Sequence, residues 1–246
     1  MTWRKRSAIS RGSAAERRIA SMQRAPYAGK IFAIGFYKTG TTTLFEALKG
    51  LGYRTINGDK PGSYPGADDG ETLLRQIEAG DYHLPALDLF DAFTDNPYFH
   101  LWREMYQQFP EAKFILTVRD EQPWIESCAR FYRNRRLRPM RVWMFGKHAN
   151  PGASPASRQA WLDAYRAHNA AVREHFRNLP GQYLEFDPTK MREWGPLCEL
   201  LGQPVPPQPW PHANPTRPDQ LWRAMWRRFK RGVGLELRDP AENDLS

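Results

Sequence analysis

The chain has 246 residues, of which 41% are hydrophobic, and this is enough for one sizeable α/β domain with an appended segment. Its net charge of +9 suits an acidic ligand, a nucleic acid or an anionic membrane surface and does not separate them. The two cysteines exclude a disulfide framework, have no metal-ligand spacing, and predict a reducing compartment.

The first 28 residues are basic and rich in serine and alanine, without the apolar core that a signal peptide needs. We predict that residues 1–28 form a flexible, solvated arm. No stretch of the chain approaches the roughly 18 apolar residues of a membrane span. These features predict a cytoplasmic protein.

Residues 30–44, KIFAIGFYKTGTTTL, predict a phosphate-binding loop between a strand and a helix. The uninterrupted apolar run at 31–34 is typical of a strand buried on both faces of a parallel sheet. Gly35 and Gly40 let the backbone turn and approach an anion closely. The three threonines at 41–43 then open a helix, where unpaired N–H groups and the helix dipole favour phosphate.

The loop departs from an ATP- or GTP-binding P-loop directly after its second glycine. A P-loop has lysine there, followed by a magnesium-binding Ser or Thr, whereas this chain has Thr41 and carries its lysine earlier, as Lys38. An ordinary strand-turn-helix corner with a surface lysine is the alternative interpretation. The loop with lysine before its second glycine and threonine after it resembles the loop of sulfotransferases that use 3'-phosphoadenosine 5'-phosphosulfate (PAPS). The resemblance implies that the donor is bound by Tyr37, Lys38, Thr39, Gly40, Thr41, Thr42 and Thr43, that Lys38 is catalytic, and that no metal is required.

Acidic residues follow the next predicted elements, which are a short strand at 53–56, a helix at 71–79 and a second buried strand at 83–89. Carboxylates beyond a strand end lie where ligands bind in open α/β sheets. A hydroxyl acceptor needs a proton acceptor there, and Asp95 is the first candidate, followed by Asp91 and His100. Alternatively, Asp95 or Asn96 before Pro97 caps a helix over 98–109.

Residues 113–118 predict a third strand, which Arg119 follows, and Asp120 can cap a helix over 121–133. Ser127 lies almost two turns beyond Asp120 and so returns to the face that Arg119 borders. A guanidinium and a hydroxyl suit a second phosphate. The pair resembles a second sulfotransferase signature, which implies that Arg119 and Ser127 hold the 3'-phosphate of PAPS. A structural salt bridge and an unrelated serine are the alternative.

Residues 130–147 combine seven basic with four aromatic side chains, which could follow a nucleic acid or form a lid over an anionic donor. Beyond them we predict a long helix at 157–176, a fourth strand at 182–186, and a helix at 191–201 ended by Gly202. The stretches 58–69 and 137–157 are predicted loops that would line the acceptor. The sequence indicates no metal site.

Residues 194–206 and 209–214 resemble the closing segment of bacterial sulfotransferase-family proteins, so the likeness covers residues 30–214. It implies a three-layer α/β/α P-loop-like domain over 29–214 with a mostly parallel sheet. We predict that residues 215–246 are a separate C-terminal segment, in which the pattern at 218–231 indicates a basic amphipathic helix. That helix would either dock on the domain or contact an anionic membrane surface.

The predicted function is transfer of a sulfuryl group from PAPS to a hydroxyl or amine of a small-molecule, glycan or lipid acceptor, with release of 3',5'-bisphosphoadenosine. Lys38 would neutralise the leaving oxygen, and Gly40 with the three threonines would hold the 5'-phosphate. An ATP-dependent small-molecule kinase and a non-enzymatic nucleic-acid-binding protein are the alternatives, and nucleic acid is the less expected partner. The sequence names neither the acceptor nor the oligomeric state.

Overall fold

The computed structural model describes residues 29–58, 62–64, 67 and 70–211, and these residues contain one five-stranded sheet. The strands are β1 (Ile31–Ala33), β2 (Thr55–Asn57), β3 (Ala92–Thr94), β4 (Lys113–Thr117) and β5 (Tyr183–Phe186). All of their pairings are parallel, in the order β2-β3-β1-β4-β5. The predicted arm at 1–28 and the predicted helix at 218–231 lie outside the described residues.

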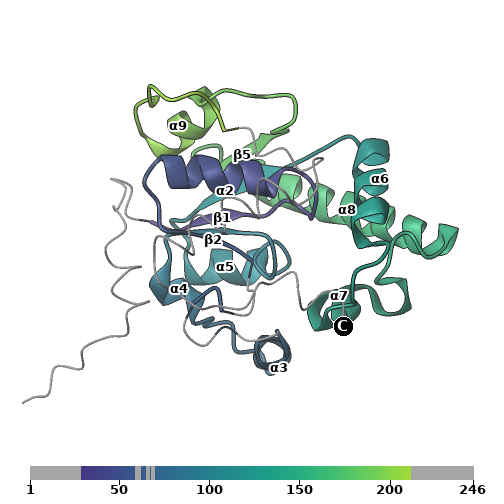
Figure 1. Cartoon of the computed structure of the whole chain (residues 1–246). Helices are drawn as coiled ribbons and strands as arrows, with labels where there is room; N and C mark the ends of the chain where they lie inside the picture. The colour runs from purple at the N-terminus through teal and green to yellow at the C-terminus, as the bar shows by residue number, and fades with distance from the viewer. Residues whose placement is uncertain (1–28, 59–61, 65–66, 68–69, 212–246) are drawn as a thin grey trace, which may run out of the picture.

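Helices cover both faces of the sheet, which confirms the predicted three-layer α/β/α fold (Figure 1). One face carries α2 (Thr41–Gly50) and α9 (Gly195–Leu201). The other carries α3 (Glu71–Glu78), α4 (Ala86–Leu89), α5 (Trp102–Gln108), α6 (Glu121–Tyr132), α7 (Pro139–Phe145) and α8 (Pro155–Phe176), with a 3-10 turn, η1 (Gly146–His148), after α7.

The apolar run in β1 explains why the protein has two cores. Successive side chains of a strand point to opposite faces. Phe32 therefore packs in the core shared with α3 to α8, while Ile31 and Ala33 pack in the core shared with α2 and α9. All three are fully buried, as a strand in the centre of a parallel sheet requires.

The parallel arrangement gathers the candidate residues at one edge of the sheet. Lys38 follows β1, Asp95 follows β3 and Arg119 follows β4, and β1 pairs with both of the other strands. A Cβ on Gly35 would lie 2.0 Å from Thr117 Oγ1 and 2.4 Å from the Thr117 carbonyl oxygen, so only glycine lets the loop after β1 lie this close to β4. This is the edge at which open α/β sheets bind ligands.

The predicted strand at 83–89 is wrong. Pro85 has helical dihedrals (φ −55°, ψ −31°) and the residues after it form the short helix α4. Leu84, before the helix, and Leu87, within it, are both buried, so the apolar run contributes to a core without being a strand. The strand in this region is β3, which begins seven residues after Pro85. The apolar content therefore located a buried segment but not its type.

The predicted helix at 98–109 begins later, at Trp102. Residues 97–100 instead form turns, in which the N–H groups of His100 and Leu101 both donate to the Pro97 carbonyl. Asp95 and Asn96 are therefore not helix caps; α5 has no side-chain cap.

Other predicted elements differ mainly at their ends. The strand predicted at 53–56 lies at 55–57, and the helix predicted at 191–201 begins at Gly195, after a turn in which Asp187 O accepts from Lys190 and Met191. The predicted loop 137–157 contains α7, which starts at Pro139 and buries Met140, followed by η1.

Candidate active site

The loop after β1 leaves the N-terminus of α2 without a side-chain cap. Gly40 is the N-cap residue, with φ +98°, and a Cβ there would lie 2.9 Å from Pro188 Cγ. The first N–H groups of a helix have no partner within it, and the helix dipole adds positive potential. Thr41 is buried, Thr42 exposed and Thr43 half-buried. The geometry fits a phosphate group.

Lys38 has a left-handed backbone, with φ +63°. Its ammonium lies over the Phe131 ring, 4.2 Å from the ring centroid, which is a cation–π contact. Partial burial lowers the pKa of Lys38, and the neighbouring charges of Arg135 and Arg119 lower it further. Cys128 and Asp95 act in the opposite direction. The lysine therefore lies close to two cationic side chains and one carboxylate.

Asp95, directly after β3, also has a left-handed backbone, with φ +69°. Its Oδ1 accepts a hydrogen bond of 2.9 Å from the Asn96 N–H. A Cβ on Gly58 would lie 3.6 Å from the Asp95 Cβ, so the turn after β2 packs against this carboxylate. The negative charge of Asp95 contributes to raising the pKa values of Tyr37 and Tyr132, after the larger effect of burial. Asp95 thus faces the loop that carries Lys38.

Among the described residues, Lys38 and Asp95 are the two non-glycine residues with positive φ. For a lysine this conformation costs roughly 1–2 kcal/mol, and such strain concentrates at active sites and ligand clamps. Both residues lie just beyond the carboxyl ends of paired strands, β1 and β3. No local signal in the sequence indicates the left-handed backbone at either position.

Arg119 and Ser127 are both half-buried, the first at the end of β4 and the second on α6. The pKa of Cys128, the residue after Ser127, depends on the charges around its thiol. Burial raises the pKa of its thiol, and the positive charges of Lys38 and Arg119 oppose that rise. Both cations therefore act on the part of α6 that carries Ser127.

Tyr165 holds the backbone of Arg119 and was missed by the sequence analysis. The Arg119 N–H donates to the Tyr165 hydroxyl (3.0 Å), and the hydroxyl donates to the Arg119 carbonyl (2.9 Å). Arg119 and Tyr165 line a groove of about 450 Å³, together with residues that include Asn169 and Lys190. A tyrosine in the apolar stripe of a long helix gives no sign of this role, because the sequence does not show that it faces β4.

Two predicted donor-binding residues have their side chains engaged within the protein. The Thr39 hydroxyl is fully buried, donates to the Phe36 carbonyl (2.6 Å) and pairs with the Thr117 hydroxyl (2.7 Å). The Tyr37 ring is buried and its hydroxyl donates to Met144 Sδ (3.8 Å), while the Tyr37 backbone carbonyl accepts from the Trp124 indole (2.7 Å). Thr39 and Tyr37 thus fix the shape of the loop, and at these two positions only the backbone is left to contact a phosphate.

Asp91 precedes β3 and so lies at the opposite edge of the sheet from Lys38, where its carbonyl accepts from Ile31 N. Its carboxylate pairs with Arg54 through bonds of 2.7 and 2.8 Å. Burial opposes ionisation of Asp91, but the hydrogen bonds from Arg54 outweigh it and the pKa is lowered. The prediction that Asp91 lies with Asp95 beyond a strand end is therefore wrong, and Asp91 is not a candidate base.

His100 remains near Asp95, in the turn before α5. Its side chain is exposed, and its ring contacts the edge of Trp143 of α7 at 4.7 Å between centroids. Partial desolvation lowers the pKa of His100, which favours the neutral imidazole. No group of three or more His, Cys, Asp or Glu side chains within the described ranges could hold a metal ion.

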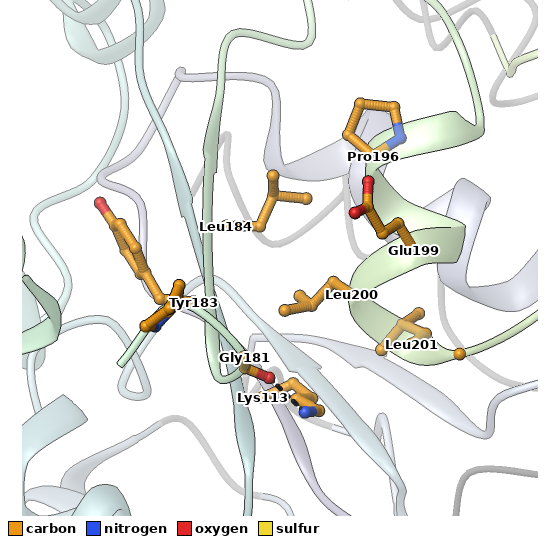
Figure 2. A pocket seen from close by; sticks show the side chains of 10 residues that line it. Lys113, Gly181, Tyr183, Leu184, Pro196, Glu199, Leu200 and Leu201 are labelled. Carbon is orange, nitrogen blue, oxygen red and sulfur yellow. Dashed lines mark hydrogen bonds between the residues drawn. The ribbon is translucent and has the colours of Figure 1, made fainter. Parts of the chain in front are cut away.

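A larger pocket, of about 630 Å³, lies elsewhere (Figure 2). It is lined by Lys113 and Tyr183, which begin β4 and β5, and by residues of α9 such as Leu200. The Lys113 ammonium donates to the Gly181 carbonyl, and both residues line this pocket. The pocket is at the amino edge of the sheet, away from Lys38 and Asp95.

Comparison with known proteins agrees with this geometry. A family model described as a sulfotransferase domain matches residues 30–218, so the chain belongs to the sulfotransferase family. It is also 26% identical over 216 residues to Ava biosynthesis cluster protein M of Aspergillus versicolor, in a match that covers 74% of this chain and 80% of that protein. The fold is accordingly P-loop-like, and the chain is a transferase of sulfuryl groups. None of the helices that the structure describes is long and apolar enough to cross a membrane.

Proposed function

We propose that the protein transfers a sulfuryl group from PAPS to a hydroxyl or amine of an acceptor. The observation that carries this proposal is the strained pair Lys38 and Asp95, a cation and a carboxylate beyond neighbouring strands, beside an uncapped helix N-terminus. PAPS supplies an activated sulfuryl group whose leaving group is a phosphate. A site for this chemistry needs an anion cradle, a cation at the leaving oxygen and a base for the acceptor.

Each requirement has a candidate in this chain. The N–H groups at the start of α2, with the Thr41, Thr42 and Thr43 side chains, would hold the 5'-phosphate. Lys38 would leave the Phe131 ring and neutralise the leaving oxygen. Asp95 would take the proton from the acceptor hydroxyl, with His100 as the second candidate.

Arg119 would bind the 3'-phosphate of the donor, with Ser127 as a second contact. A guanidinium provides a fork of donors that matches phosphate and stays charged at any physiological pH. No ion pair of Arg119 occurs within the described part of the chain, and Tyr165 fixes its backbone. The residue therefore has an oriented main chain and a guanidinium available for an anion.

We expect 3',5'-bisphosphoadenosine to stabilise the protein much more than adenosine 5'-monophosphate does. At a ligand concentration of ~100 times its dissociation constant, the stabilisation should be about 2.7 kcal/mol. Thermal unfolding with each nucleotide at equal concentration measures the difference. The preference follows from the 3'-phosphate, which only the bisphosphate offers to Arg119.

Arg119→Ala should abolish that preference and leave the weaker effect of the monophosphate in place. Arg177→Ala is the matched control, because Arg177, the residue after α8, is exposed and within the described residues forms an ion pair only with Glu174. Equal shifts with both nucleotides in the wild-type protein would remove Arg119 and Ser127 from this role.

A further inference from the structure

Helix α8 contacts both of the segments that carry the proposed donor-binding residues. The helix is anchored on the sheet near its C-terminus, where the Phe176 ring contacts Phe114 of β4 at 5.0 Å between centroids. Farther toward its N-terminus, at the carboxyl edge of the sheet, Tyr165 bonds the backbone of Arg119. His168 follows Tyr165 by three residues and therefore lies on the same side of the helix. Two polar side chains of α8 thus face the edge at which the donor is proposed to bind.

His168 contacts the backbone at the start of the loop after β1. Its Nε2 lies 2.7 Å from the carbonyl oxygen of Ile34, the residue before Gly35. Its ring also meets the Phe36 ring edge to face, at 5.0 Å between centroids. Both contacted residues lie within four positions of Lys38. His168 therefore acts on the segment whose backbone sets the place of the proposed catalytic lysine.

The imidazole of His168 donates this hydrogen bond in its neutral form. Burial lowers the pKa of His168 to about 4, although the bond to Ile34 acts in the opposite direction. A neutral imidazole carries one proton, and a carbonyl oxygen can only accept, so the proton is on Nε2. Ile34 is fully buried. Removal of the donor would therefore take a hydrogen bond from a carbonyl that is shielded from water.

The two backbones that α8 bonds belong to different proposed phosphate sites. Ile34 precedes the loop that leads to the 5'-phosphate cradle at the start of α2, whereas Arg119 is the proposed contact of the 3'-phosphate. A binding site is precise when the residues around it lock the groups that touch the ligand. One helix with a hydrogen bond to each segment sets the position of both relative to the sheet.

We propose that His168 is a positioning residue for the loop that binds the 5'-phosphate of the donor, and that Tyr165 has the corresponding role for the 3'-phosphate. This inference rests on the proposed function. Neither side chain has to touch the donor, because each orients the backbone of residues that do. Substitution of either residue should therefore weaken the binding of one phosphate and leave the binding of the other unchanged.

Three nucleotides separate the two roles: adenosine 5'-monophosphate, adenosine 3'-monophosphate and 3',5'-bisphosphoadenosine. Isothermal titration calorimetry measures the Kd of each. We expect His168→Leu to raise the Kd of the 5'-monophosphate and of the bisphosphate about three- to tenfold, the scale of one hydrogen bond, and to leave that of the 3'-monophosphate unchanged. Tyr165→Phe should raise the Kd of the 3'-monophosphate and of the bisphosphate by a similar factor, and leave that of the 5'-monophosphate unchanged.

His168→Gln and His175→Leu are the controls. Glutamine can place an amide N–H near the position of the imidazole Nε2, so His168→Gln should restore the wild-type constants. The His175 ring, two turns farther along α8, packs on Trp102 and Tyr106. His175→Leu therefore removes an imidazole from the same helix without removing a bond to either loop, and should change none of the three constants.

A purely structural role of His168 would lower the thermal stability of His168→Leu and leave all three Kd values at the wild-type level. That result would overturn the inference, and so would an equal weakening of both monophosphates or a failure of His168→Gln to restore binding. His168→Asn repeats the test with a polar side chain that is too short to reach the Ile34 carbonyl, and should match His168→Leu.

The outcomes separate this inference from the proposed function. If the wild-type protein prefers the bisphosphate to both monophosphates and His168→Leu leaves every constant unchanged, the inference alone is overturned. If the wild-type protein binds all three nucleotides equally, or binds none of them, the proposed function and the inference are contradicted together.

Discussion

Lys38→Met is expected to lower kcat for sulfuryl transfer by roughly 100-fold or more, which is the scale of losing one electrostatic contact to a developing charge. Charge on the leaving oxygen develops fully only in the transition state, so the KM for PAPS should change far less than kcat. Methionine keeps an unbranched apolar side chain that can still pack on Phe131 and removes only the ammonium. Steady-state kinetics at saturating acceptor measures both constants.

Lys49→Met is the control for this substitution. Lys49 is exposed in the last turn of α2, the helix that follows the loop, and has no part in the proposed chemistry. Its kcat should match that of the wild-type protein. If Lys38→Met has an undiminished kcat, the proposed role of the lysine is wrong.

Asp95→Asn is expected to lower kcat for transfer to a hydroxyl by on the order of 100-fold or more, which is the contribution of a positioned general base. Asparagine tolerates the left-handed backbone, and its amide oxygen can still accept from the Asn96 N–H. The local fold should therefore persist while the ability to take a proton is lost. Stabilisation by 3',5'-bisphosphoadenosine should stay at the wild-type level.

His100→Gln and Asp91→Asn complete the comparison. We expect His100→Gln to keep most of the activity, and Asp91→Asn to lower thermal stability through the weakened pair with Arg54 without a specific loss of kcat. An active Asp95→Asn together with an inactive His100→Gln would identify His100 as the base.

The sequence predicted those strands and helices whose apolar pattern is bounded by residues that end or cap an element. β1, β4 and β5 lie within the predicted strands, α2 begins at the predicted threonines, and α8 begins two residues before the predicted start at 157 and ends where predicted. In each case a continuous apolar run or a helical period is bounded by glycine, proline or a capping residue. α8, for example, begins after Ser154, which accepts a hydrogen bond from Ser157 N.

Prediction failed where one apolar pattern fits two structures. Residues 83–89 have the composition of a buried strand, and Pro85 is compatible either with an edge strand or with the first turn of a helix. The choice depends on which neighbours Leu84 and Leu87 meet, and that is tertiary information. The same limitation hid α7, whose buried Met140 and exposed Trp143 form too short a period to indicate a helix.

For the candidate site, the sequence indicated residue types but not their shared edge. Spacing suggested Lys38, Asp95 and Arg119, and the strand order shows that they follow three adjacent strands. Asp91 looked equivalent to Asp95, four residues away. The length of β3 places these two carboxylates at opposite edges of the sheet. The contacts of Tyr165 and Phe131 depend on helices α8 and α6 packing near the loop, which no local pattern indicates.

The most direct test of the proposed donor is a product analysis with PAPS and, in parallel, ATP with magnesium. The purified protein is incubated with a mixture of hydroxyl and amine compounds, and mass spectrometry identifies the modified products. We expect sulfated products and 3',5'-bisphosphoadenosine from PAPS in the presence of a metal chelator, and product formation at least roughly 100-fold slower with the Lys38→Met protein. Phosphorylated products from ATP with magnesium, and none from PAPS, would contradict the account.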